Sequence, residues 1–148
     1  MATPNEATFE LEVRRTYRAT PAKVYQAWTK AEAVARWFAP SNEYRVVVHE
    51  LDVKVGGRYR IEMAHQSGRS SIALGTYREL EPGKRIAFTW KWESRPTMPE
   101  TVVEIDLLPQ GNDTELVLTH RLFDEGADRD NHEKGWCGCL DQLPNALA

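Results

Sequence analysis

The sequence contains little cysteine: two residues, Cys137 and Cys139, in 148. If their segment is helical, as its pattern indicates below, the two side chains lie about 200° apart around the helix axis. They then cannot form a disulfide with each other or hold one metal ion between them. Stability must therefore come from an apolar core, and a chain of this length buries about 68–70% of the surface that its unfolded form exposes.

Three features that direct a protein to nucleic acid or to a membrane are also missing. Lys and Arg are scattered and the formal net charge is −3, so no clustered basic face for nucleic acid is expected. The amino-terminal segment lacks the basic and apolar regions of a signal peptide. No apolar run approaches the roughly 20 residues of a membrane helix. We therefore expect a cytoplasmic protein that binds neither nucleic acid nor a membrane.

Catalytic motifs are missing as well. The sequence has no G-x-S-x-G, no P-loop and no G-x-G-x-x-G. Its four histidines, His49, His65, His120 and His132, are dispersed without the spacing of metal ligands. We expect no metal and no cofactor, and the sequence leans away from an enzyme.

What is present is an alternation of apolar and polar residues, which is typical of strands with one buried face. Short turns such as Gly56-Gly57 and Glu81–Lys84 join the later segments, and short connections make neighbouring strands antiparallel. The predicted strands are Phe9–Val13, Tyr44–Leu51, Tyr59–His65, Ser70–Leu80, Ile86–Trp92, Val103–Leu107 and Leu116–His120.

Two short helices are predicted after the first strand. Thr20 is a favourable N-cap, Pro21 suits the first helical position, and Pro40 ends the second helix. Apolar residues recur at helical spacing in both: Val24, Ala27 and Trp28 in the first, Val34, Trp37 and Phe38 in the second.

A long helix is predicted from Gly126 to about Leu143, where Pro144 ends or kinks it. One stripe of residues at three- and four-residue steps marks its buried face. The stripe consists of His132, Trp136, Cys139, Leu140, Leu143 and Leu147. With residues 1–8 as a flexible tail, residues 9–148 form a single α+β domain, in which a curved seven-stranded antiparallel sheet wraps around this helix and leaves a cavity between them.

Several motifs occur in a fixed order along nearly the whole chain. They are Thr20-Pro21 with Val24–Thr29, Arg36–Pro40, Asp52–Gly57, Phe88–Trp92, Leu118–His120, and His132 with Gly135-Trp136. In these motifs the chain resembles the START-like, or SRPBCC, superfamily, and most closely the heat-shock-protein-90 ATPase activator homologue family. The resemblance implies the helix-grip fold. It does not decide the function, because the family includes small-molecule binders, self-resistance proteins, polyketide cyclases and co-chaperone domains.

The predicted site is an apolar pocket between sheet and helix. Its expected wall is the inward-facing set Tyr59, Met63, Phe88, Trp90, Trp92, Val103, Leu116, His120, His132 and Trp136. Without a cavity these are simply core residues. The carboxylates of the strands fall on the opposite parity, which disfavours a mechanism with paired carboxylates.

Two histidines in this set have two interpretations each. His120 has inward parity, so it either is hydrogen-bonded within the protein or orients a ligand or a proton. His132 either packs the helix on the sheet or forms part of the pocket wall.

The leading hypothesis is therefore binding of a small, largely apolar ligand of aromatic, polyketide or lipid-like character. One alternative is a cyclase- or hydrolase-type enzyme with His120 or His132 as acid and base. Another is a co-chaperone-like interaction domain that regulates a heat-shock-protein ATPase, with an incidental cavity. A homodimer and a chaperone partner both remain open.

Overall fold

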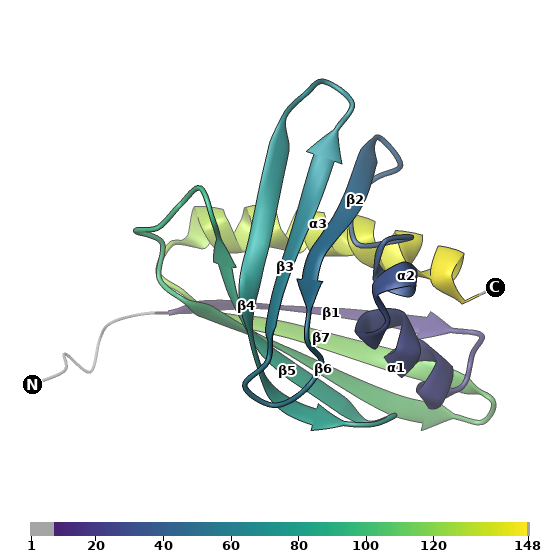
Figure 1. Ribbon diagram of the computed structural model, residues 1–148. Coiled ribbons are helices and arrows are strands. Elements are labelled where there is room, and N and C mark those ends of the chain that lie inside the picture. The colour runs from purple at the N-terminus through teal and green to yellow at the C-terminus, as the bar shows by residue number, and fades with distance from the viewer. Residues whose placement is uncertain (1–7, 148) are drawn as a thin grey trace, which may run out of the picture.

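The computed structural model describes residues 8–147, so the expected tail lies outside the described residues except for Thr8. One strongly bent sheet grips a single long helix, α3, which crosses its concave side (Figure 1). The strands are β1 (Phe9–Tyr17), β2 (Tyr44–Leu51), β3 (Arg58–His65), β4 (Ser70–Glu81), β5 (Arg85–Trp92), β6 (Thr101–Gln110) and β7 (Asp113–Phe123). The helices are α1 (Pro21–Thr29), α2 (Ala31–Val34), α3 (Gly126–Gln142) and the 3₁₀ helix η1 (Leu143–Ala146).

The sheet has seven strands in the order β1-β7-β6-β5-β4-β3-β2, and every neighbouring pair is antiparallel. From β2 to β7 the connections are too short for a crossover, so consecutive strands pair as antiparallel neighbours. Gly83 and Gly111 adopt φ angles of 74° and 64° in the β4–β5 and β6–β7 turns, a region that glycine enters without steric cost. The predicted α+β helix-grip fold is confirmed.

The helices α1 and α2 close one end of the sheet. The Thr20 side chain accepts a hydrogen bond from the Lys23 amide, and Pro21 occupies the first turn, as predicted. The second helix is a single turn, shorter than its sequence pattern indicates. The residues after it are held instead by tertiary contacts, among them the bond from Trp37 Nε1 to the Ala27 carbonyl at 2.8 Å.

Helix α3 ends at Gln142, close to the predicted boundary, and Pro144 lies in the first turn of η1. A residue at position 144 in a continuing helix would donate its N–H to the Leu140 carbonyl, and proline has no N–H. That carbonyl instead accepts the Tyr17 hydroxyl at 2.7 Å. The C-terminal end of α3 is thereby fastened to β1.

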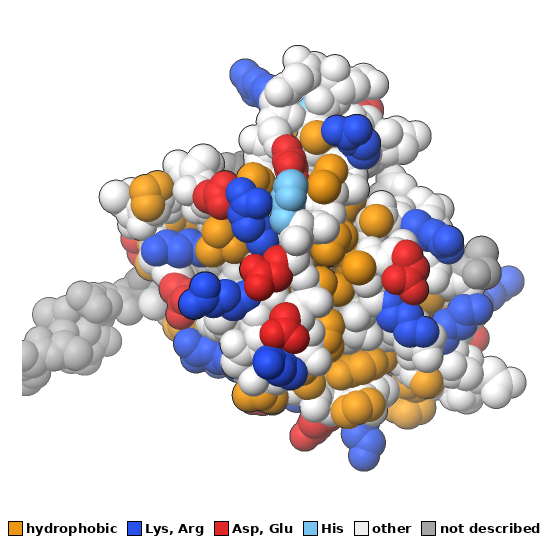
Figure 2. Space-filling model, in the orientation of Figure 1, with side chains coloured by type: hydrophobic (Ala, Val, Ile, Leu, Met, Phe, Trp, Pro, Cys, Tyr) orange, Lys and Arg blue, Asp and Glu red, His pale blue; other side chains and the backbone are white. Residues whose placement is uncertain are grey.

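The outer surface of the sheet is strongly charged. Arg85 on β5 contacts Glu79, Glu104 and Asp106 at 2.6, 2.7 and 2.8 Å. Figure 2 shows charged side chains over much of the face formed by β3 and β4, with a band of hydrophobic side chains between β2 and α1. Among the described residues, no helix is long and apolar enough to span a membrane.

A candidate ligand-binding site under helix α3

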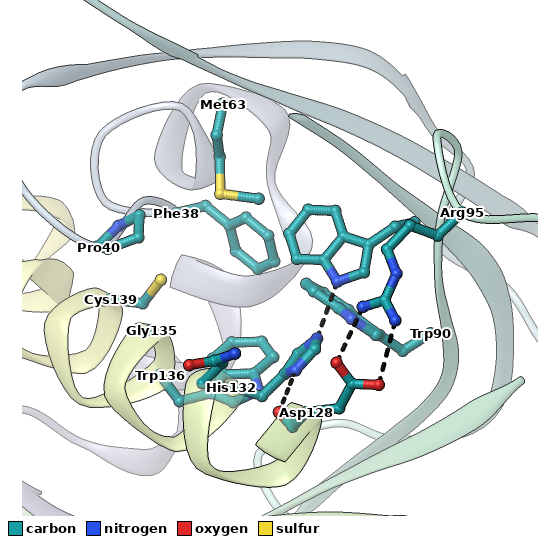
Figure 3. A pocket seen from close by; sticks show the side chains of 12 residues that line it. Phe38, Pro40, Met63, Trp90, Arg95, Asp128, His132, Gly135, Trp136 and Cys139 are labelled. Carbon is teal, nitrogen blue, oxygen red and sulfur yellow. Dashed lines mark hydrogen bonds and ion pairs between the residues drawn. The ribbon is translucent and has the colours of Figure 1, made fainter. Parts of the chain in front are cut away.

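A pocket of about 280 Å³ opens between α3, the sheet and the segment that follows α2. Helix α3 forms one wall and β3 and β5 form the other (Figure 3). The lining residues are Phe38, Pro40, Met63, Trp90, Trp92, Arg95, Asp128, Asn131, His132, Gly135, Trp136 and Cys139.

Aromatic rings make up most of the apolar wall. Alternation along β5 puts Trp90 and Trp92 on the same face, with ring centroids 5.2 Å apart. Trp136 on α3 lies 5.2 Å from Trp90 and 5.8 Å from Phe38, the latter edge-to-face. These rings bury one another, and their remaining faces present an apolar surface to the pocket.

One end of the pocket is polar. Arg95, in the β5–β6 loop, binds the Asp128 carboxylate through two bonds of 3.0 and 3.1 Å. The hydrogen bond from Arg95 lowers the pKa of Asp128 below its ordinary value. In Figure 3 this pair lies beside His132, whereas Met63, Phe38, Pro40 and Cys139 lie toward the other end.

His132 uses both ring nitrogens within the protein. Its Nδ1 donates to the Asp128 carbonyl at 2.7 Å, one helical turn earlier, and its Nε2 accepts the indole N–H of Trp92 at 2.8 Å. Because the indole can only donate, Nε2 carries no proton and the ring is neutral. Burial lowers the pKa of His132 below 6.5, which favours the neutral ring.

His120 has the opposite tautomer. Its Nδ1 accepts the indole N–H of Trp136 at 3.0 Å, so its Nε2 carries the proton and donates to the Thr101 hydroxyl at 2.7 Å. That hydroxyl donates onward to the Trp90 carbonyl. Full burial, and secondarily the charge that His132 would carry, hold the pKa of His120 well below 6.5.

The structure separates the predicted wall into three groups. Met63, Trp90, Trp92, His132 and Trp136 line the pocket. Tyr59 and Phe88 line a second void of about 20 Å³ instead. Val103, Leu116 and His120 are fully buried and line neither space.

The expectation that His120 borders the cavity therefore needs correction. The inward parity is right, but its ring packs against Trp90 and Trp136, with centroids at 5.7 and 6.2 Å, and these rings take its place at the pocket wall. The alternation along a strand determines which face of the sheet a side chain lies on, but not whether that part of the bent sheet borders the pocket.

Sequence reasoning missed several lining residues. Asp128 and Gly135 fall on the same helical face as His132, so the stripe extended to polar and small residues would have found them. Cys139 belongs to the predicted stripe but was not assigned to the pocket wall. Arg95 and Pro40 come from loops, for which no periodicity exists.

Two indole N–H groups in this region are buried and, within residues 8–147, have no hydrogen-bond partner: Trp28 Nε1 and Trp90 Nε1. Such groups are rare in native structures and call for an explanation. The described residues contain no group of three or more His, Cys, Asp or Glu that could hold a metal ion. Burial raises the pKa of the Cys139 thiol, so this cysteine is an unreactive wall residue.

Comparison with known proteins finds the family described as activator of Hsp90 ATPase homolog 1-like protein, whose model matches residues 18–148. No curated protein matches the sequence significantly.

Several solved structures share the fold. A Chromobacterium violaceum protein is 29% identical with a TM-score of 0.82, covering 90% of this chain and 93% of its own. An Arthrobacter aurescens protein is 16% identical with a TM-score of 0.84, covering 93% and 85%. A Silicibacter pomeroyi protein described as AHSA1 is 21% identical with a TM-score of 0.79, covering 91% and 94%.

Proposed function

Because the chain belongs to the family of activator of Hsp90 ATPase homolog 1-like proteins, we propose that it uses the space characteristic of its fold to bind a small, largely apolar ligand. The observation that carries this proposal is the pocket of about 280 Å³ under α3, with its wall of aromatic side chains. A cavity of about 150 Å³ accepts benzene. This pocket therefore suits a bicyclic aromatic compound, or one ring with a short chain.

The state of the two histidines supports binding over acid–base catalysis. Both nitrogens of His132 and both nitrogens of His120 are engaged inside the protein. A general base needs a lone pair within reach of the substrate proton. The cyclase- or hydrolase-type alternative would require one of these bonds to break first. The cytoplasmic location and a homodimer stay predictions.

A direct test is isothermal titration calorimetry with n-butylbenzene and 2-naphthol as probes. Gly135 lines the pocket, and a Cβ added to it would meet no atom within 4 Å. We expect the purified protein to bind at least one probe. Gly135→Leu should weaken that binding by about tenfold or more, because its side chain fills part of the pocket and even one methylene group in an apolar pocket changes affinity by about that factor. Lys134→Leu, on the exposed side of the same helix, is the matched control and should bind normally. Absence of binding by both probes would contradict the proposal.

A second candidate is docking of a protein partner, in particular a heat-shock-protein ATPase. The band of hydrophobic side chains between β2 and α1 favours it (Figure 2). The discriminating measurement is ATP hydrolysis by the heat-shock-protein-90 of the same organism with and without this protein. An increase that survives Gly135→Leu would support the docking candidate.

A further inference from the structure

The phenyl ring of Phe38 borders two separate spaces in the protein interior. It lines the pocket of about 280 Å³ under α3, which we call the outer compartment. It also lines the void of about 20 Å³ between α1, α2 and the sheet, which we call the inner compartment. Among residues 8–147, no other residue is shared by the walls of these two spaces. Phe38 is therefore the partition between them.

This partition is held firmly. Only 3% of Phe38 is exposed. Its ring makes edge-to-face contacts with Trp37 and Trp136, at centroid distances of 5.3 and 5.8 Å, and lies 6.5 Å from Trp28. A ring enclosed by large aromatic groups on several sides has little room to change rotamer, since protein interiors are close-packed.

Each compartment is lined by one tryptophan whose indole N–H has no hydrogen-bond partner within residues 8–147. Trp90 lines the outer compartment and Trp28 lines the inner one, but both N–H atoms are themselves buried, so neither is exposed to these spaces. A volume of about 10–15 Å³ is enough for one water molecule. The inner compartment, at about 20 Å³, is barely larger than this, so it cannot admit a ligand ring while Phe38 is in place.

We infer that Phe38 sets the length of the ligand: it confines the ligand to the outer compartment and closes off the inner compartment. This inference rests on the proposed binding function. The ligand class it implies is compact, with one or two fused rings or one ring with a short chain. Phe38 acts here as a specificity-determining residue.

The experiment uses a homologous series of probes, from ethylbenzene to n-octylbenzene, titrated by calorimetry. Each CH₂ group that becomes buried should raise affinity about fourfold. In the wild-type protein we expect affinity to rise with chain length and then level off once the chain reaches Phe38. In Phe38→Ala the rise should continue for further CH₂ groups into the inner compartment. Phe38→Leu keeps a large apolar side chain, so the chain length at which affinity levels off should shift less. This variant tests the inference even if Phe38→Ala fails to fold.

Phe88→Leu is the matched control. Phe88 is also buried, and it lines the inner compartment but not the outer one. Shortening it therefore enlarges the inner space without opening the partition. Its affinity profile should level off at the wild-type length.

Three results would overturn the inference. They are an unchanged profile in both Phe38 variants, a shift in Phe88→Leu as large as in Phe38→Leu, or a wild-type affinity that rises unbroken to n-octylbenzene. All three still leave ligand binding itself intact. Failure of every alkylbenzene and of 2-naphthol to bind the wild-type protein would instead contradict the binding function, and this inference with it.

Discussion

The indole N–H of Trp136 donates to Nδ1 of His120 over 3.0 Å, and this bond ties α3 to the middle of the sheet. It starts a chain of three hydrogen bonds that runs from α3 through His120 on β7 and Thr101 on β6 to the Trp90 carbonyl on β5. Trp90 in turn lines the pocket. His120 thus supports the pocket wall from behind.

This arrangement predicts that His120→Leu destabilises the protein. The substitution leaves the buried N–H of Trp136 without a partner, and an unsatisfied buried donor costs about 1–3 kcal/mol. Urea unfolding should show a loss of that size. In a double-mutant cycle with Trp136→Phe, the second substitution should cost less in the His120→Leu background, because both polar partners are then gone. If the losses of unfolding free energy in His120→Leu and Trp136→Phe simply add in the double variant, the bond between Trp136 and His120 does not contribute to stability.

The two buried histidines also predict how stability depends on pH. Burial lowers the pKa of His120 and of His132 in the folded protein, whereas the unfolded chain titrates near 6.5. For His132, the neighbouring Arg95 lowers the pKa further, and the Asp128 carbonyl and carboxylate oppose these effects in part.

Well above pH 6.5 both histidines are neutral in the folded protein and in the unfolded chain, so they do not reduce the free energy of unfolding. Below pH 6.5 the unfolded chain takes up protons that the folded protein resists, so stability falls toward the lowered folded pKa values. The slope reaches at most about 1.4 kcal/mol per pH unit for each histidine. We expect a lower free energy of unfolding at pH 5.5 than at pH 7.5, and a shallower slope in His132→Gln. Equal stability at the two pH values would show that the histidines are not held neutral.

Two glycines of α3 predict opposite responses to the same substitution. A Cβ on Gly138 would lie 2.2 Å from the Pro40 carbonyl oxygen, whereas one on Gly135 would meet no atom within 4 Å. Ala favours a helix over Gly by about 0.8–1.0 kcal/mol. Gly135→Ala should therefore raise the melting temperature. Gly138→Ala should lower it, because α3 must move away from Pro40. A stabilising Gly138→Ala would mean that the helix does not approach this closely.

The strands and helices were accessible from the sequence because their signals are local. Alternation of apolar and polar residues located all seven strands, and the stripe that contains His132, Trp136 and Cys139 located α3 to within a residue or so of its end. These periods depend only on how many residues make one turn or one pleat. The motifs around Trp37 and Trp90 added the family, whose model covers residues 18–148.

The pocket itself was decided by the tertiary structure. Leu116, His120, Trp90 and Met63 share the inward parity, yet only Trp90 and Met63 reach the pocket. Which inward side chains face empty space depends on where the sheet bends and where α3 crosses it. The bond between Arg95 and Asp128 and the place of Phe38 between two compartments likewise join residues from distant segments. Local periodicity cannot predict such contacts, because they form only when distant segments come together in the folded protein.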